Sequence, residues 1–136
     1  MKKKTIVLLV LVLLMTFIFT GCGTTKENSA ISKQAMNDYY TYYNNGQIDG
    51  CLAIIHPSLA DALGGTEATK DILTTRLEYY GNVIEYDINQ TGFETANGES
   101  EFFYTVTAKY ESGDEFEETF TIFVSNGVAQ IIVIDI

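Results

Sequence analysis

The sequence of 136 residues is short of the side chains that most metal sites and redox centres need. It has one histidine, His56, and two cysteines, Cys22 and Cys51, with no Cys-x-x-Cys pair and no His-Glu-x-x-His motif. It also has no glycine-rich phosphate loop, nucleophile elbow or calcium loop. We therefore expect no metal site and no cofactor. No motif indicates a particular catalysed reaction.

Basic side chains are also scarce. The chain has 8 lysines and arginines against 18 aspartates and glutamates, which gives a formal net charge of −10, and three of the lysines occupy positions 2–4. A field of this sign repels phosphate backbones and anionic lipid headgroups. We expect no nucleic-acid partner, whereas charge leaves cationic partners such as basic peptides or metal ions open.

Residues 1–21 are typical of a signal peptide. The lysines precede a non-polar stretch over residues 6–19, which is shorter than the roughly 20 residues of a membrane-spanning helix. The stretch ends in Phe19-Thr20-Gly21-Cys22 and resembles the lipobox of bacterial lipoproteins, in which a cysteine after small residues is lipidated and becomes the new N-terminus. The family prefers leucine where this chain has Phe19. The resemblance implies lipidation of Cys22 and anchoring at the extracytoplasmic face of a cell membrane.

Cleavage before Cys22 changes the charge and the cysteine count. The mature chain keeps five basic side chains against 18 acids, a net charge of −13. Cys51 then has no partner within the chain, and the simplest interpretation is a small buried apolar side chain. Residues 22–30 are small and polar, and we expect a flexible tether there. The alternatives to lipidation are an uncleaved single-span anchor and an ordinary secreted protein.

The first half of the domain, which we expect over residues 31–136, has helical periodicity. Apolar residues recur every three to four positions over 31–44, before a typical helix stop at Asn44-Asn45-Gly46. A short helix is expected over 48–55 and one further turn over 58–63. The third helix is expected from Glu67 to Tyr80 with Thr66 as its N-cap. The side chains that it should bury are Ala68, Ile72, Leu73, Leu77 and Tyr80.

The second half has the period of two that is typical of strands. Alternation begins at residues 84–88 and, after a loop expected over 91–99, resumes over 102–110. The next strand covers 116–124, and Asn126-Gly127 predicts a hairpin into the last strand. That strand is apolar on both sides, with Val128, Ile132, Ile134 and Ile136 on one face and Ala129, Ile131 and Val133 on the other.

This order of elements predicts an α+β fold in which two to three N-terminal helices pack on a curved four-stranded antiparallel sheet. Four segments resemble the nuclear-transport-factor-2-like, or cystatin-like, superfamily. They are the helix ending Tyr-Tyr-Asn-Asn-Gly, the short helix before Ile55-His56-Pro57, the helix closing Glu78-Tyr79-Tyr80-Gly81, and the strand over 102–110. The resemblance covers residues 31–136 and implies a cone, often with a pocket at its open end. That superfamily holds isomerases, dehydratases and binding proteins, so it does not imply one function.

Three residues are weak candidates for catalysis. Alternation places Glu118 on the face that meets the helices, and the resemblance to isomerases of the superfamily makes Glu118 with Tyr104 a candidate acid–base pair. Because burial of an unpaired carboxylate costs several kcal/mol, we expect Glu118 to line a pocket or to lie at the rim of the cone, and the favoured alternative is a solvated strand end. His56 is a candidate general base beside Asp61, although a helix-breaking His-Pro turn is the favoured interpretation.

Aromatic residues supply the candidates for binding. Four tyrosines crowd the first helix and span more than half of its circumference, so at least one should be exposed, and Tyr39, Tyr42 and Tyr43 are the candidates. The favoured interpretation is that two or three of the four belong to the core and that the rest are exposed without a role. Members of the superfamily that the chain resembles commonly dimerise through the outer face of the sheet. The resemblance, together with Phe103 and Phe123 on that face and the last strand, implies a homodimer or an envelope protein partner, and the alternative is a last strand buried within a single domain.

We therefore expect a binding domain for a small apolar ligand or a protein partner, anchored to the membrane and without identifiable catalysis. The alternatives are a small isomerase or hydratase that uses a pocket carboxylate and a tyrosine, and a structural dimerisation module.

Overall fold

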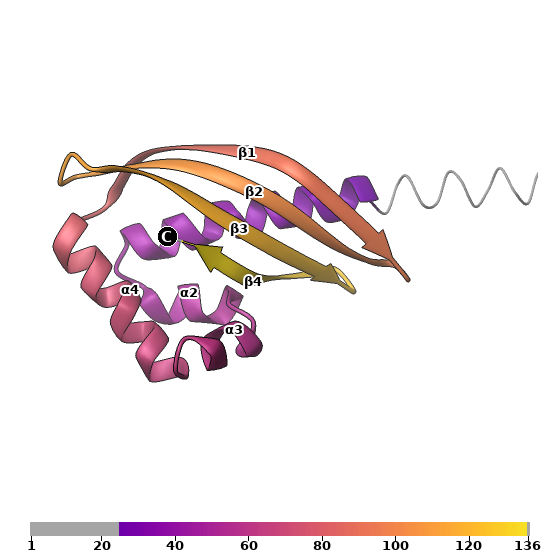
Figure 1. Ribbon diagram of the computed structural model, residues 1–136, viewed down its shortest axis with the longest axis horizontal. Helices are drawn as coiled ribbons and strands as arrows, with labels where there is room; N and C mark the ends of the chain where they lie inside the picture. The colour runs from indigo at the N-terminus through magenta and orange to yellow at the C-terminus, as the bar shows by residue number, and fades with distance from the viewer. Residues whose placement is uncertain (1–24, 136) are drawn as a thin grey trace, which may run out of the picture.

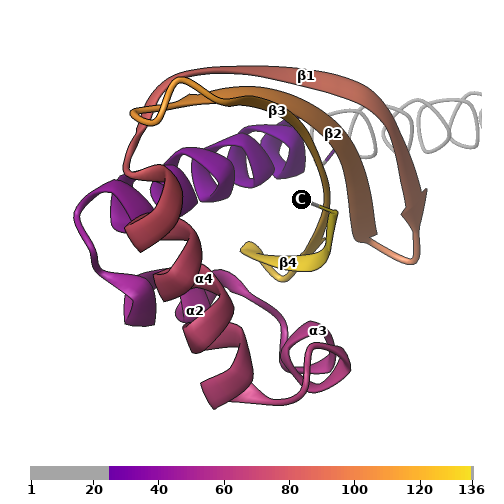
Figure 2. The ribbon, with the colours of Figure 1, turned by 60° about the vertical axis from the view of Figure 1, so that its left-hand side comes forward.

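A curved sheet wraps around one side of a long helix, and the other helices lie on the same concave side (Figures 1 and 2). The structure, a computed structural model, describes residues 25–135. The predicted signal peptide and the lipidation of Cys22 lie outside the described residues. Helices come first and four antiparallel strands follow, so the predicted α+β class is confirmed.

Residues 25–44 form the long helix, called here the first helix, and residues 25–30 correct the predicted boundary of the tether. Their polar side chains hold the helix against the sheet, since Asn28 is buried and its Nδ2 donates to Ser100 Oγ at 3.2 Å. Ser29 Oγ donates to Gln90 Oε1, also at 3.2 Å. Composition alone predicted a tether, because a run of small polar residues cannot bury much apolar surface. Composition cannot show that these polar groups have hydrogen-bond partners on the strands.

The helix stop after residue 44 is confirmed, and it also joins the helix to the sheet. Asn44 Nδ2 donates to the carbonyl oxygen of Val83, and Asn44 Oδ1 accepts from the backbone N–H of Val83, both at 2.8 Å. The chain then reverses through Gly46, whose φ of +68° lies in the left-handed region that favours glycine. One side chain thus fixes where the helix ends and where the sheet begins.

Three shorter helices follow: α2 (Ile48–Ile54), α3 (Pro57–Ala62) and α4 (Thr66–Tyr80). Gly65 is the N-cap of α4, and Thr66 is its first residue rather than its cap. The predicted buried face of α4 is shifted, because Thr69 and Leu73 are buried whereas Ile72 is exposed. The buried side of α4 therefore contains a polar residue, whose hydroxyl donates to the carbonyl oxygens of Gly65 and Ala60, at a position where the apolar pattern predicted none.

The sheet is a meander with the order β1-β2-β3-β4, formed by β1 (Val83–Ala96), β2 (Glu99–Tyr110), β3 (Glu115–Ser125) and β4 (Val128–Asp135). The loop expected over 91–99 is wrong, because β1 continues through this segment and turns only at Asn97-Gly98, two residues with positive φ. A register irregularity between Gln90 and Gly92 breaks the alternation there and hides the strand from the period-two pattern.

The last strand also contains a bulge, which corrects the faces predicted for it. Thr121 pairs with Val133 and Ile122 with Ile131, so Ile132 is an extra residue. Ile131 is fully buried, whereas Val128 and Val133 are 59% and 46% exposed. Ile134 packs against the core despite being predicted on the face of Val128. A strand with a bulge changes faces partway along, so strict alternation fails.

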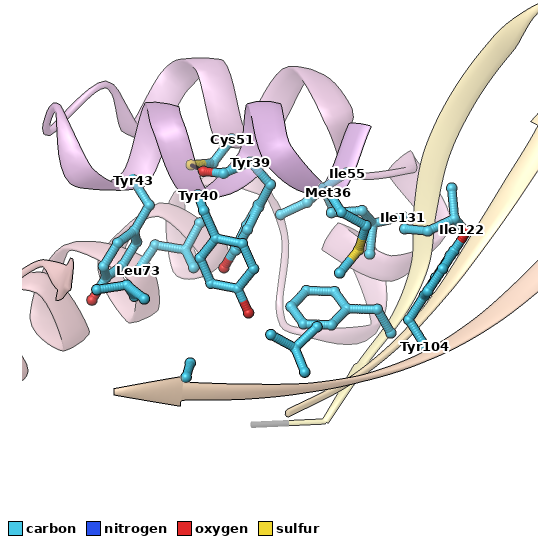
Figure 3. Packing of buried hydrophobic residues seen from close by; sticks show 14 of the residues in the cluster. Met36, Tyr39, Tyr40, Tyr43, Cys51, Ile55, Leu73, Tyr104, Ile122 and Ile131 are labelled. Carbon is cyan, nitrogen blue, oxygen red and sulfur yellow. Dashed lines mark hydrogen bonds between the residues drawn. The ribbon is translucent and has the colours of Figure 1, made fainter. Parts of the chain in front are cut away.

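The core between the first helix and the sheet is rich in aromatic side chains. Figure 3 shows Tyr39, Tyr40 and Tyr43 pointing from the first helix towards the sheet. Tyr40 stacks on Tyr86 of β1 with ring centroids 4.5 Å apart, and Tyr39 meets the edge of Phe120 at 5.6 Å. These rings fill the inside of the cone at its centre.

Candidate functional site

A buried carboxylate lies inside the cone at the end where α4 meets the sheet. Glu118 of β3 is 1% exposed, so it lies neither at the rim nor at a solvated strand end, and both expectations are wrong. Its Oε2 accepts from the Tyr40 hydroxyl at 2.6 Å, and its Oε1 accepts from Arg76 Nη2 at 2.9 Å and from the Tyr110 hydroxyl. Alternation was right about its face but did not reveal the three donors that allow it to be buried.

Arg76 supplies the cation and also packs on aromatic rings. Its guanidinium lies 5.4, 5.5 and 5.8 Å from the ring centroids of Tyr80, Tyr110 and Phe116, and its Nη2 also donates to the Tyr110 hydroxyl at 2.9 Å. Stacking of this kind keeps arginine charged in a partly dry site. Burial alone would lower the pKa of Arg76, but the hydrogen bond and negative charge around it raise the pKa overall.

The two tyrosines of this cluster stay protonated. Burial raises the pKa of Tyr40 far above its usual range, and the adjacent Glu118 carboxylate raises it further. Burial and the same carboxylate also raise the pKa of Tyr110. Each hydroxyl therefore remains a donor to Glu118, and the cluster of Glu118, Arg76, Tyr40 and Tyr110 is arranged to stabilise the fold rather than to exchange protons with a ligand.

The other catalytic candidates lie apart from this cluster. Tyr104 is buried, and its hydroxyl is hydrogen-bonded to Ser32 of the first helix rather than to Glu118. His56 is the N-cap of α3, where its Nδ1 accepts from the backbone N–H of Ser58 at 3.1 Å and is hydrogen-bonded to Ser58 Oγ at 2.7 Å. The structure therefore does not bring the predicted acid–base pair together, and His56 has a local role at the helix start.

Two of the three tyrosines that were candidates for binding are not on the surface. Tyr39 and Tyr43 are buried under the sheet, because the sheet curls around the side of the helix that carries them. Tyr42 is half-buried, and its ring covers Gly50 of α2 so closely that a Cβ at Gly50 would lie 2.6 Å from it. The strongly exposed tyrosine is Tyr79, near the end of α4.

Figure 1 shows the N-terminal part of the first helix beneath the end of the sheet where β1 and β2 meet. A surface groove is lined by residues of this helix and of these two strands. This groove, called here the mouth groove, has a volume of about 700 Å³. Its lining consists of Thr25, Lys26, Ser29, Ala30, Lys33, Gln90, Phe93 and Phe102. Phe93 is 54% exposed and stacks on the buried Phe102 with ring centroids 6.1 Å apart, so the groove has an aromatic floor.

The charge of the mouth groove differs from that of the rest of the domain. Lys26 and Lys33 are exposed, neither takes part in an ion pair within residues 25–135, and no acid lines the groove. By contrast, a hollow on the outer face of the same hairpin, of about 440 Å³, is lined by Glu94, Glu99 and Glu101. The mouth groove is therefore a basic and apolar site on an acidic protein.

Sequence reasoning missed the mouth groove because it assigned part of each wall to an irregular segment. Lys26, Ser29 and Ala30 fell in the tether, whereas Lys33 fell in the expected first helix, and Phe93 fell in the expected loop. A signal was present, since these four helix positions have the spacing i, i+3, i+4 and i+7, which places them on one face.

No protein-family model matches the chain, and no curated protein matches it. One similar solved structure is an NTF2-like protein of unknown function from Burkholderia pseudomallei, at 15% identity and a TM-score of 0.36, with 76% of this chain and 87% of that one covered. Another is an uncharacterised cystatin-fold protein from Novosphingobium aromaticivorans, at 10% identity and a TM-score of 0.40, with 74% of this chain and 96% of that one covered. A third is TerC co-crystallised with polyporic acid, at 15% identity and a TM-score of 0.38, with 77% of this chain and 92% of that one covered.

These structural neighbours include NTF2-like and cystatin-fold proteins. Within residues 25–135, no group of three or more histidine, cysteine, aspartate or glutamate side chains is arranged to hold a metal ion. No helix in that same stretch is both long and apolar enough to span a bilayer. Phe103 and Phe123, the residues expected to mediate dimerisation, are half-buried on neighbouring strands.

Proposed function

We propose that this protein is a lipoprotein anchored through Cys22 at the extracytoplasmic face of a cell membrane, and that its domain binds a small apolar ligand in the mouth groove without transforming it. The observation that carries the proposal is the exposed ring of Phe93, stacked on the buried Phe102, in a groove of about 700 Å³. Sites of 300–1,000 Å³ with apolar walls and a few polar groups are typical for small molecules.

The buried cluster supports binding over catalysis. A general acid or base needs a lone pair or a proton within reach of the substrate. Both oxygens of Glu118 already accept hydrogen bonds, and the side chain is shielded from solvent. An isomerase or hydratase that used Glu118 would first have to break these contacts, whereas a ligand reaches the mouth groove directly.

The position of the anchor supports a ligand that comes from the membrane. Cys22 precedes Thr25, which lines the mouth groove, by three residues, and three residues span at most about 11 Å even when fully extended. A lipid on Cys22 would therefore hold the mouth groove near the bilayer surface, where apolar molecules are concentrated.

Native mass spectrometry of the full mature chain, purified from its own host and released from detergent micelles, tests the proposal. We expect a co-purifying small molecule that is lost in Ala30→Trp, because the indole fills the groove from an exposed helix position. Ala53→Trp is the matched control, at an exposed position of α2. Absence of any bound molecule in the unmodified protein, or equal loss in both variants, would contradict ligand binding.

The anchor is tested in the same spectra. We expect the N-terminal Cys22 to carry the mass of a lipid group, and Cys22→Ser to remove this mass and to release the chain from the membrane fraction. An unmodified, water-soluble mature chain would exclude the lipoprotein assignment and leave the binding site to be judged by itself.

Self-association is a second candidate function, and the exposed side chains of β4 favour it. This strand is an edge of the sheet, and Val128 and Val133 on it are largely exposed. If β4 pairs with a second copy, the native mass spectra should contain a dimer that Val133→Glu abolishes. A monomer at micromolar concentration would exclude this candidate.

A further inference from the structure

The chemistry of the ligand can be inferred from the charge at the mouth groove. The mature chain keeps five basic side chains and 18 acids, yet the groove contains two of the five lysines and arginines and none of the acids. The local field at the groove therefore attracts an anion, although the field of the whole domain repels one.

The two lysines are placed to act together. They lie seven positions apart on the first helix, which is two turns on one face and about 10 Å along the axis. Between them, Ser29 is hydrogen-bonded to Gln90 of β1, and this contact fixes the helix beside the strand. The ammonium groups of Lys26 and Lys33 therefore flank the groove, and neither is engaged in an ion pair within the described part of the chain.

The floor requires an apolar group on the same ligand. Phe93 stacks on Phe102 at a tilt of 25° between ring planes, and about half of the Phe93 side chain remains in contact with solvent. An apolar group that covers this exposed phenylalanine removes its surface from water, and this burial contributes favourable free energy to binding. A purely polar anion would pair with the lysines and leave the Phe93 ring exposed to solvent. A neutral apolar molecule would cover the ring and leave the lysines without an anionic partner.

We propose that the mouth groove binds a single-chain anionic amphiphile, with its acyl chain on Phe93, which stacks on the buried Phe102, and its anionic head at Lys26 and Lys33. This inference rests on the proposed function and names the ligand class of the same groove. Free fatty acids and single-chain phospholipids share this chemistry, so the test has an arm for each.

The test is photo-crosslinking on the full lipidated chain in phosphatidylcholine nanodiscs. The probe is a hexadecanoic acid with a diazirine on its chain, and the matched probe carries a hydroxyl in place of the carboxylate. We expect the carboxylate probe to label peptides that contain Phe93 or Phe102 about two- to fivefold more than the alcohol probe, as expected for a short-range charge pair near a surface. Ala30→Trp should abolish this labelling, and Ala53→Trp should not.

Charge reversal at one lysine tests the contribution of the anionic head independently of that of the acyl chain. Lys33→Glu should reduce labelling by the carboxylate probe at least about fivefold and leave the alcohol probe unchanged. Lys109→Glu is the matched control, because Lys109 is an exposed lysine on the outer face of the sheet and the substitution changes the net charge equally. Equal losses in both variants would overturn the inference, since a general field would then be responsible.

Competition by unlabelled amphiphiles identifies the class and the source. Fatty acids of 12, 14 and 16 carbons should compete with an affinity that rises up to about fourfold per methylene group. Stronger competition by lysophosphatidic acid than by hexadecanoic acid assigns the groove to single-chain phospholipids, and the reverse assigns it to free fatty acids.

The outcomes separate this inference from the proposed function. Equal labelling of the groove by the alcohol and carboxylate probes would refute the anionic head and leave the apolar binding site intact. If neither probe labels the groove, the inference fails, and the native mass spectra then decide whether the proposed function fails with it.

Discussion

Replacement of Arg76 by leucine should destabilise the fold far more than replacement of its partner by glutamine. Arg76→Leu leaves the Glu118 carboxylate, whose side chain is 2% exposed, without its cation, and removal of one partner from a buried pair costs about 3–5 kcal/mol. Glu118→Gln keeps one of the two acceptor oxygens, which can still accept from Arg76 and Tyr110, and leaves Arg76, with a side chain 17% exposed, partly hydrated. We expect this variant to lose about 1–2 kcal/mol. The two costs differ because Arg76→Leu leaves an unpaired charge in the buried Glu118 carboxylate, whereas Glu118→Gln leaves one in the more exposed Arg76 guanidinium.

The assay is urea unfolding of the full chain in a fixed detergent, followed by far-ultraviolet circular dichroism. Lys70→Leu on the same helix is the matched control, because Lys70 pairs with Asp49 at 3.1 Å but the two side chains are 42% and 83% exposed. Such a pair contributes at most about 1 kcal/mol. If Arg76→Leu costs no more than Lys70→Leu, or less than Glu118→Gln, the argument that a buried charge needs its partner here is refuted.

Two further predictions concern packing and pH. Gly50→Ala should destabilise by about 1–3 kcal/mol although alanine favours a helix, because the new methyl group meets the Tyr42 ring, and the same change in a Tyr42→Ala background should stabilise. Urea titrations of the four proteins test this, and destabilisation in both backgrounds would contradict it. Burial raises the pKa of Tyr40 far above 10.0 and raises the pKa of Tyr43 and of Cys51 to about 12, so the folded state keeps protons that the unfolded chain releases above pH 9 to 10. The free energy of unfolding should be fully retained below pH 9 and should fall as pH rises towards 12, by about 1.4 kcal/mol per pH unit for each ionised group. A free energy that stays constant from pH 9 to 12 would contradict it.

The parts of the fold that follow local rules could be predicted from the sequence. The first helix stops where Asn44-Asn45-Gly46 indicates, and the hairpin at Asn126-Gly127 joins β3 to β4. The face of Glu118 was also correct, because side-chain direction in a regular strand depends only on position. These features need no knowledge of what lies opposite.

The parts that depend on distant partners could not be predicted. Asn28 belongs to the first helix because Ser100, 72 positions away, completes its hydrogen bonding. The bulge at Ile132 shifts the last strand to a new face without any local signal in an all-apolar segment. Glu118 was expected near solvent because the sequence shows a carboxylate but not that Arg76, 42 positions earlier, lies beside it.

The distribution of the basic residues gives the strongest reason to place function at the mouth groove. Arg76 is needed to bury Glu118, Lys70 is paired with Asp49, and Lys109 lines a hollow of the outer face together with three acids. Lys26 and Lys33 have no such explanation, since no acid lies three or four positions away from either along the helix. Within residues 25–135, no ion pair joins these two exposed cations to the helix or the sheet, and both line a groove beside the exposed ring of Phe93. Their position therefore indicates a role in binding a ligand, and Lys33→Glu should leave the free energy of unfolding within about 0.5 kcal/mol of the unmodified protein while it weakens binding of the carboxylate probe.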